Sequence, residues 1–470
     1  MKRLLILIVV IILFGCEKVA PDTWRLKTKE NFDLINKPIL PTTNPTPSKV
    51  GFVIDSNWFK KQFTGYWIET HNGKGEGDFN GDGKKDLVVM FAKNTESKYQ
   101  FQRHDSSRVV VGVFINHKTY FELDTNLVYS YLGGYSDISV ADINNDGYLD
   151  IYQMTGYWKG ESFLKPPYYN NNGRGGMNSF VFMNNKNKNF TKYILPIQND
   201  GASTESIIFD NNKNGMSEIY SQSCLCYFEF NGNSFVRNNL YLDNNFKNIN
   251  YNLNVITPKY ADKNIGMIFI SENIFGESYF ILKVENNKLI PKIKFKPRYL
   301  NSGPPQKIHI EDLDNDGKME YIIPMWISEN SDNTIPATPY LMIVDENGND
   351  VSNKYMDSEL TKPLTYEQFD WIGSWQTGFI FYTFADMDND GIMEIFPASG
   401  VGHKKGNDTY YYKLINGRYE LKLYHTGWIG NIHDSKIKHY TYKAFTDEKN
   451  GVNIFLILER SLHLSIFKTF

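Results

Sequence analysis

The amino-acid sequence predicts an all-β protein built from repeated units. The 31 Tyr and 32 Phe far outnumber the 8 Trp, and aromatic residues make up 15% of the 470 residues, which favours strands. No long stretch with helical periodicity follows the first 20 residues. A short acidic motif recurs along the chain, each time followed by an apolar run. Together these features predict a seven-bladed β-propeller of four-stranded blades.

The first 15 residues have the pattern of an export signal. Lys2 and Arg3 precede an apolar run over residues 4–14, and Cys16 follows. The run is short for a membrane span, although an uncleaved anchor is the alternative. Residues 13–16 resemble the lipobox of bacterial lipoproteins, which implies a signal peptide over residues 1–15 and lipidation of Cys16. By the same resemblance, Glu17 implies an anchor in the outer membrane of the cell envelope, with the periplasmic or surface face left open.

A tether and a large domain follow the signal. After Cys16, residues 17–50 lack periodicity and end in a Pro/Thr-rich run that we expect to stay extended and solvated. We therefore divide the chain into a signal peptide (1–15), a lipidated cysteine and tether (16–50) and a propeller domain (51–470), which we expect to be monomeric.

The net charge excludes one class of partner. Without residues 1–15 the chain loses two of its 50 basic residues, and 48 basic minus 53 acidic residues gives −5. This excludes a basic nucleic-acid-binding protein. The two remaining cysteines, Cys224 and Cys226, occupy alternate positions of an extended stretch, too far apart for an unstrained disulfide. We expect both to be small core residues.

Five copies of the acidic motif place oxygen-bearing side chains at positions 1, 3, 5 and 9, with Gly at position 6. We call them the first (residues 78–86), second (142–150), third (210–218), fourth (312–320) and fifth (386–394) loops. A dense row of carboxylates repels itself unless a cation lies among them, and calcium takes six to eight such oxygens. The sequence predicts up to five structural calcium sites, and we expect position 7 to add a backbone carbonyl. The predicted ligands are Asp78, Asn80, Asp82, Asp86, Asp142, Asn144, Asp146, Asp150, Asp210, Asn212, Asn214, Glu218, Asp312, Asp314, Asp316, Glu320, Asp386, Asp388, Asp390 and Glu394.

The alternatives to such calcium loops are EF-hands and metal-free turns rich in Asp and Asn. An EF-hand loop ends with Glu at position 12 between helices, whereas here the last ligand is at position 9 and the flanks read as strands. Asx-rich turns without metal remain open for any one copy, but five copies in one register argue against them for the set. The third loop has only two carboxylates and is expected to bind least tightly.

Two weaker copies bring the number of units to seven. They lie at residues 262–266 and 447–451 and lack most of the acidic side chains. The last unit is short, and we expect an early strand at residues 50–54 to complete it and close the ring. Hairpin turns are expected within the units at Asn231-Gly232, Asn286-Asn287, Asn347-Gly348 and Asn416-Gly417.

The recurring D-x-[DN]-x-[DN]-G-x-x-[DE] loop resembles the FG-GAP and VCBS repeats of integrin α-type β-propellers. In that family the loop joins the first two strands of a blade and binds calcium. The resemblance covers five strong and two weaker units over residues 51–470, whereas the Phe-Gly and Gly-Ala-Pro elements that name the family are not evident.

No catalytic motif is present: the nine histidines are scattered, and no H-E-x-x-H, G-x-S-x-G or Walker loop occurs. Two long connections are rich in aromatic residues and suit contact with a glycan or protein, or packing over neighbouring blades. We expect a calcium-stabilised, membrane-anchored binding or adhesion module. The alternatives are a carbohydrate-active enzyme similar to propeller polysaccharide lyases, or a scaffold of an envelope complex. The candidate partner surface comprises Tyr157, Trp158, Tyr168, Tyr169, Arg174, Trp371 and Trp375.

Overall fold

The computed structural model shows an all-β protein whose described residues form mostly antiparallel sheets of three to five strands. The structure describes residues 67–68, 74–94, 107–117, 121–132, 138–154, 179–196, 206–221, 225–244, 253–273, 278–299, 302–303, 308–327, 338–356, 382–385, 392–397, 409–425, 440–447, 451–458 and 464–468.

The first three sheets follow one another along the chain. The first sheet contains β1 (Trp67–Ile68), β2 (Lys74–Gly77), β3 (Asp86–Asn94), β4 (Ser107–Asn116) and β5 (Phe121–Leu132). The second contains β6 (Ile138–Ala141), β7 (Asp150–Gln153), β8 (Phe180–Asn184) and β9 (Phe190–Ile194). The third contains β10 (Ser206–Phe209), β11 (Glu218–Ser221), β12 (Cys226–Phe230) and β13 (Phe235–Asn239).

The remaining sheets continue in the same order. The fourth contains β14 (Tyr241–Leu242), β15 (Leu253–Asp262), β16 (Gly266–Asn273), β17 (Tyr279–Glu285) and β18 (Lys288–Phe295), with β14 and β18 parallel. The fifth contains β19 (Ser302–Gly303), β20 (His309–Glu311), β21 (Glu320–Ile327) and β22 (Thr338–Val344), and a short helix, α5 (Ser352–Tyr355), follows it. The sixth contains β23 (Tyr382–Ala385), β24 (Glu394–Pro397), β25 (Thr409–Ile415) and β26 (Arg418–His425), and the seventh contains β27 (Tyr440–Asp447), β28 (Gly451–Leu458) and β29 (Leu464–Lys468).

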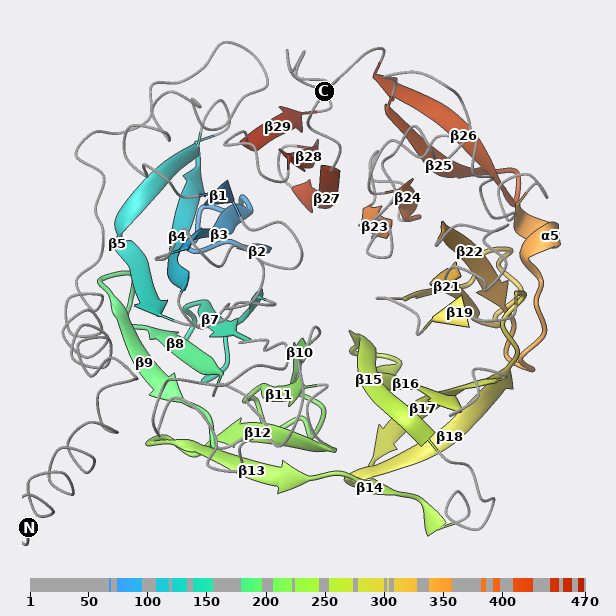
Figure 1. Cartoon of the computed structure of the whole chain (residues 1–470), viewed down its shortest axis with the longest axis horizontal. Helices are drawn as coiled ribbons and strands as arrows, with labels where there is room; N and C mark the ends of the chain where they lie inside the picture. Colours follow the sequence, from blue (N-terminus) through green and yellow to red (C-terminus); the bar gives the residue numbers. More distant parts are fainter. Residues whose placement is uncertain are drawn as a thin grey trace, which may run out of the picture.

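The sheets succeed one another around a ring, and the last one lies beside the first (Figure 1). The strands that precede an acidic loop or one of its weaker copies lie next to each other in successive sheets, as β2, β6, β10 and β15 do in turn and as β23 and β27 do later. An apolar cluster fills each of five successive spaces between sheets, because alternate side chains of a strand point to opposite faces. The sheets therefore pack face to face in chain order.

The acidic loops occupy the same place in their sheets. Position 9 is the first residue of the strand that follows the loop in five sheets, at β3, β7, β11, β21 and β24. The weaker copies take this place too, because residues 262–266 join β15 to β16 and residues 447–451 join β27 to β28. The flanking elements are strands, as predicted, so the absence of EF-hand helices is confirmed for the described loops.

Three of the four predicted hairpin turns are confirmed, because Asn231-Gly232, Asn286-Asn287 and Asn416-Gly417 join consecutive paired strands. Each has left-handed backbone at one or both residues, a conformation that suits Gly and Asn and explains the choice of residues. The Asn347-Gly348 turn follows β22 and folds back only into a single bridge between Val344 and Asp350 before α5 begins.

One expectation about the cysteines is wrong. Cys226 is fully buried in the core between the second and third sheets, as expected, but it takes part in a disulfide bond. Its partner lies outside the described residues. The alternate spacing of Cys224 and Cys226 assumed a regular strand through both residues, whereas β12 begins only at Cys226.

Several predictions fall outside the described residues. They concern the signal peptide, Cys16, the tether, the closing strand at residues 50–54 and the aromatic partner surface. Within the described part of the chain, no helix is long and apolar enough to cross a membrane.

Candidate cation-binding loops

The first four loops share one backbone hydrogen-bond pattern around position 1. Oδ2 of this Asp accepts the N–H of the position 6 Gly at 2.6 Å in the first loop and at 2.8–2.9 Å in the next three. Oδ1 accepts the N–H of position 5 at 3.0–3.1 Å in all four. The position 1 aspartates are Asp78, Asp142, Asp210 and Asp312. The carboxylate of position 1 thus holds the backbone of positions 5 and 6 in each of these loops.

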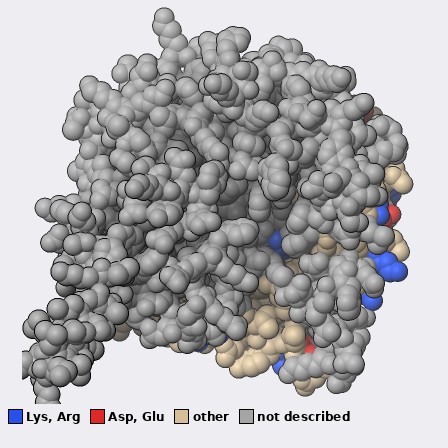
Figure 2. Space-filling view, viewed as in Figure 1, with Lys and Arg blue, Asp and Glu red and all other residues tan. Residues whose placement is uncertain are grey.

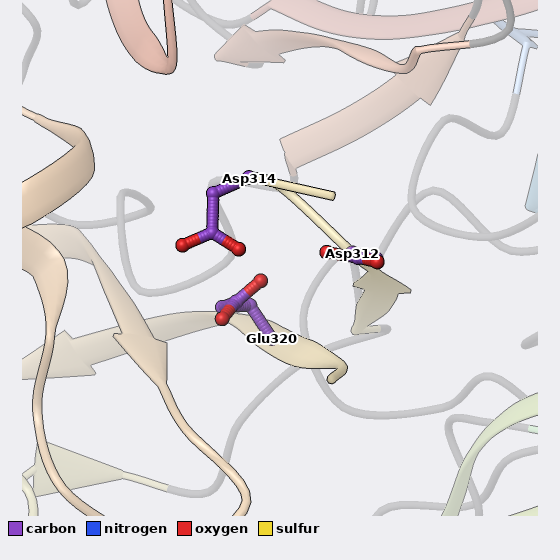
Figure 3. Close-up of side chains that lie close together, drawn as sticks. All are labelled: Asp312, Asp314 and Glu320. Carbon is purple, nitrogen blue, oxygen red and sulfur yellow. The ribbon is translucent and has the colours of Figure 1, made fainter. Parts of the chain in front are cut away.

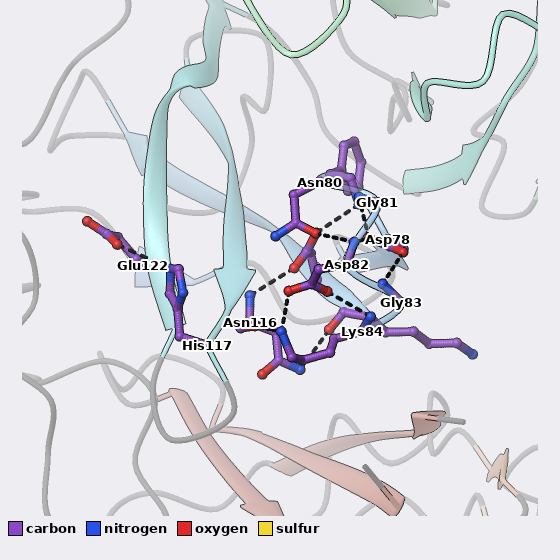
Figure 4. A network of polar contacts seen from close by, with 12 residues as sticks. Asp78, Asn80, Gly81, Asp82, Gly83, Lys84, Asn116, His117 and Glu122 are labelled. Carbon is purple, nitrogen blue, oxygen red and sulfur yellow. Dashed lines mark hydrogen bonds and ion pairs between the residues drawn. The ribbon is translucent and has the colours of Figure 1, made fainter. Parts of the chain in front are cut away.

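Positions 3 and 5 continue the pattern. In the first three loops Oδ1 of the position 3 Asn accepts the N–H of position 5 at 2.9–3.2 Å. Oδ1 of position 5 accepts the N–H of position 7 at 2.8–3.0 Å in all four loops. Figure 4 shows the first loop, in which Lys84 also forms an ion pair with Asp82. In the first four loops, the side chains of positions 1 and 5 therefore turn back onto backbone N–H groups of their own loop.

Position 4 has a role that the sequence argument missed. Its backbone is left-handed in all four loops, with φ of 75° at Gly81, 56° at Asn145, 59° at Lys213 and 58° at Asn315. Gly and Asn tolerate this conformation best, so their presence at this position was the available signal. Lys213 is the exception and holds a strained backbone.

The position 9 carboxylates are buried and bind the loop from within. Asp86 and Asp150 are 0% exposed, Glu218 is 1% and Glu320 is 5% exposed. Each accepts the backbone N–H of position 2 of its own loop, at 2.8–2.9 Å. These residues were predicted as metal ligands, and the structure gives them this structural contact as well.

An aspartate at position 9 also contacts the next strand along the chain, β4 in the first sheet and β8 in the second. Asp86 Oδ1 accepts the N–H of Asn116 at 2.8 Å, and Asp150 Oδ1 accepts the N–H of Asn184 at 2.8 Å. The side chain of each Asn donates a second hydrogen bond, to the position 8 carbonyl, at 3.0 and 3.1 Å. Neither Asn was predicted from the sequence, although V-F-I-N and V-F-M-N end the two strands alike.

Where position 9 is Glu218, only one carboxylate oxygen accepts hydrogen bonds from the described residues, whereas both oxygens do so at Asp86 and Asp150. Glu218 Oε2 accepts bonds from the Asn211 N–H and the Tyr220 hydroxyl, whereas buried Oε1 has no hydrogen-bond partner among the described residues. Glu229 of β12 accepts hydrogen bonds from the side chains of Asn212 and Asn214, at 3.5 and 2.8 Å. The third loop, poor in its own carboxylates, thus has a further one beside it.

Burial perturbs the position 9 carboxylates. It raises the pKa of Asp86 and of Asp150 from 3.8 to about 7, although two backbone N–H groups oppose the shift in each case. Burial raises the pKa of Glu218 to about 7 and also raises that of Glu320. A bound divalent cation favours the ionised carboxylate and would offset this cost.

The fourth loop brings three carboxylates closest together. One oxygen each from Asp312, Asp314 and Glu320 lies within 4.8 Å of the others, and the three side chains converge in Figure 3. Two oxygens about 2.3–2.6 Å from one calcium ion lie at most about 4.6–5.2 Å apart, so the spacing of these three oxygens is compatible with a shared ion.

Helix α5 adds two residues to this loop that the sequence argument did not predict. The Tyr355 hydroxyl donates to Asp314 Oδ2 at 3.1 Å, and the Lys354 ammonium forms an ion pair with the same oxygen. The Lys354 ammonium holds the pKa of Asp314 below its ordinary value. The described side chains visible in Figure 2 include basic and acidic residues at the edge of the ring where α5 lies.

The fifth loop is described only from its position 7 onward. Glu394 is 1% exposed, and its Oε1 lies 3.6 Å from Nζ of Lys413 on β25. The predicted ligands Asp386, Asp388 and Asp390 lie outside the described residues.

Loops of successive sheets contact one another. The Ser217 N–H, at position 8 of the third loop, donates to the Ile143 carbonyl of the second loop at 3.1 Å. The Asn187 side chain, in the β8–β9 turn, donates to the Phe79 carbonyl of the first loop at 2.6 Å. The loops are therefore parts of the inter-sheet packing.

Comparison with known proteins gives one match by sequence. Residues 78–152, from the first loop into β7, match the FG-GAP-like repeat family. No curated protein matches the chain.

Solved structures are similar only at low identity. The exotype rhamnogalacturonan lyase YesX shares 12% identity and a TM-score of 0.42, over 90% of this chain and 75% of that one. A NanB sialidase from Streptococcus pneumoniae has 9% sequence identity and a TM-score of 0.36, over 92% of this chain and 69% of that one. YCF48 from Cyanidioschyzon merolae has 11% sequence identity and a TM-score of 0.36, over 86% of this chain and 98% of that one.

Proposed function

We propose that the chain is a calcium-stabilised, seven-bladed β-propeller that acts as a binding or adhesion module for a protein or glycan at the cell envelope. The observation that carries the calcium assignment is the approach of Asp312, Asp314 and Glu320 to within 4.8 Å of one another. The shared hydrogen-bond pattern of the first four loops supports the same role for the others. Sequence similarity of residues 78–152 to FG-GAP-like repeats supports a propeller built of such units.

The role of calcium is structural in this proposal. Grouped carboxylates repel one another, and the ion neutralises them while tying the first two strands of a sheet together. Dissociation constants on the order of 10⁻⁴ to 10⁻³ M are usual for extracellular modules. At 10 mM calcium, such a site stabilises the fold by about 1.4–2.7 kcal/mol.

Thermal unfolding with metal analysis tests the calcium assignment. The purified domain, residues 51–470, is freed of metal and then titrated with calcium or, as a control, magnesium. The melting temperature should rise by several degrees with calcium, and elemental analysis should find bound calcium after dialysis. An unchanged melting temperature together with no retained calcium would refute it.

The anchored location rests on the first 16 residues. Their export pattern and the lipobox-like ending support lipidation at Cys16 and an outer-membrane location. Metabolic labelling with a fatty acid, compared with a Cys16→Ser variant, tests this step. Label retained by the variant would contradict it.

The binding role requires a partner of protein or glycan. Affinity capture from solubilised membranes, with a glycan array in parallel, tests both classes. Alanine at Trp158 and Tyr168 should reduce binding without lowering the melting temperature. A lower melting temperature with unchanged binding would instead place these residues in blade packing.

A further inference from the structure

The two oxygens of Asp314 have different surroundings. Oδ2 receives the Tyr355 hydroxyl at 3.1 Å and the ion pair from Lys354. Oδ1 is buried and has no hydrogen-bond partner among the described residues. Helix α5 thus holds one oxygen of this carboxylate and leaves the other for a ligand within the loop.

Helix α5 is itself fixed by contacts from two neighbouring sheets. Just before it, Asp350 accepts two hydrogen bonds from the Arg298 guanidinium, which follows β18, at 2.7 and 2.8 Å. At its end, Arg418 of β26 donates to the carbonyls of Asn353 and Lys354 at 3.4 and 3.2 Å. The helix has little freedom to move away from Asp314, so its two side chains are lasting parts of the loop's environment.

Tyr355 is placed to orient the acidic groups. Its side chain is 1% exposed, and its hydroxyl interacts with both Asp314 and Glu320. The hydroxyl carries one proton, which it donates to Asp314. A hydrogen bond to a charged group is worth more than one between neutral groups, so the phenol fixes the orientation of Asp314 effectively.

Lys354 opposes cation binding at the fourth loop, whereas Tyr355 favours it. Its side chain is 55% exposed, so its ion pair with Asp314 is solvated and screened by salt. A positive charge beside the carboxylates competes with an arriving cation and opposes its binding. The two neighbours on α5 therefore influence one site in contrary directions.

We infer that α5 sets the cation affinity of the fourth loop, with Tyr355 as a positioning residue that strengthens binding and Lys354 as a tethered competitor that weakens it. The inference rests on the proposed calcium role of this loop. It adds to that role two residues outside the repeated motif and links the site to the sixth sheet through Arg418.

Calcium titration of residues 51–470 tests the inference, with isothermal calorimetry as the readout. Asp312→Asn identifies the binding component that belongs to the fourth loop. Tyr355→Phe should weaken this component about threefold or more, because the ring stays and the donor is lost. Lys354→Met should strengthen it about threefold at low salt, and the gain should shrink at high salt.

Two matched variants and a spectroscopic signal separate positioning from general stability. Tyr241→Phe removes an exposed phenol from β14, and Lys422→Met removes an exposed ammonium from β26; neither should change the Asp312-dependent component. Terbium bound at the fourth loop should be sensitised by the adjacent Tyr355, and this emission should fall in Tyr355→Phe but persist in Lys354→Met.

The outcomes distinguish the inference from the function on which it rests. If Tyr355→Phe and Lys354→Met both leave the Asp312-dependent affinity unchanged, the role of α5 is overturned and the calcium site stands. If the unmodified domain shows no Asp312-dependent binding of calcium, the calcium role of this loop is itself overturned.

Discussion

Asn184 donates its backbone N–H to the carboxylate of Asp150 across the second sheet, at 2.8 Å. The Asn184 side chain donates a second hydrogen bond to the neighbouring carbonyl of Leu149, at 3.1 Å. Asn116 donates the same two bonds to Asp86 and Lys85 in the first sheet. Position 9 thus connects its loop to the next strand along the chain through bonds between protein groups.

Asp150→Asn should destabilise the metal-free domain by about 2 kcal/mol. The carboxylate accepts two backbone N–H groups in a buried place, and an amide offers only one acceptor oxygen. Urea unfolding after metal removal measures the change. Asp146→Asn, at an exposed position of the same loop, is the matched control and should cost much less. Equal losses in the two variants would contradict the structural role of Asp150.

Lys213→Gly should stabilise the domain by about 0.5–1 kcal/mol. Lys213 is exposed and has a φ of 59°, which an L-residue with a side chain adopts only under strain. Lys263→Gly is the control, because Lys263 is equally exposed in a turn but is not among the residues with positive φ. Urea unfolding should show a gain for the first and a loss or no change for the second.

Gly348→Ala should cost more than Gly232→Ala, which we expect to cost about 1 kcal/mol. Both glycines have positive φ, of 84° and 94°. A methyl group at Gly348 would collide with the backbone carbonyl of Lys294, whereas nothing lies within 4 Å of one at Gly232. A loss of about 3 kcal/mol or more is therefore expected at Gly348. Similar melting temperatures for the two variants would contradict the close contact between this turn and β18.

The metal-free domain should lose stability as the pH rises from about 4 to 7. Burial raises the pKa of Asp86 and Asp150 from 3.8 to about 7, so the folded chain binds more protons than the unfolded chain across this range. Their contribution is complete below pH 3.8 and is lost as the pH passes 7. Melting temperatures in metal-depleted buffers should be higher at pH 5 than at pH 8. Saturating calcium should reduce the difference, because it favours the ionised forms.

The loops and their strands were predictable from sequence because their determinants are local. Position 9 begins a strand wherever an apolar run follows it, as at Glu320 and Glu394. The Asn-Gly turns were predictable for the same reason, since one dipeptide sets the backbone of a turn. The hydrogen bonds between the acidic side chains and the backbone of their own loop also join residues fewer than ten positions apart.

The rest depends on contacts between distant segments. Asn116 meets Asp86 across 30 residues, and its role requires knowledge of the strand register. Tyr355 meets Asp314 across 41 residues through a four-residue helix that has no strong sequence signal. The sequence therefore predicts the ligands of a loop better than the residues that adjust it.

The turn at residues 262–266 shows how such repeats can diverge. Asp262 Oδ1 accepts the N–H of Asn264, two residues further on, at 2.7 Å, and β16 already begins at Gly266, where φ is 86°. The turn is therefore shorter than the acidic loops, and one carboxylate bonded to nearby backbone N–H groups is its local support. A repeat can thus lose most of its acidic side chains and still join its two strands, so the ring of sheets does not require the full acidic motif in every unit.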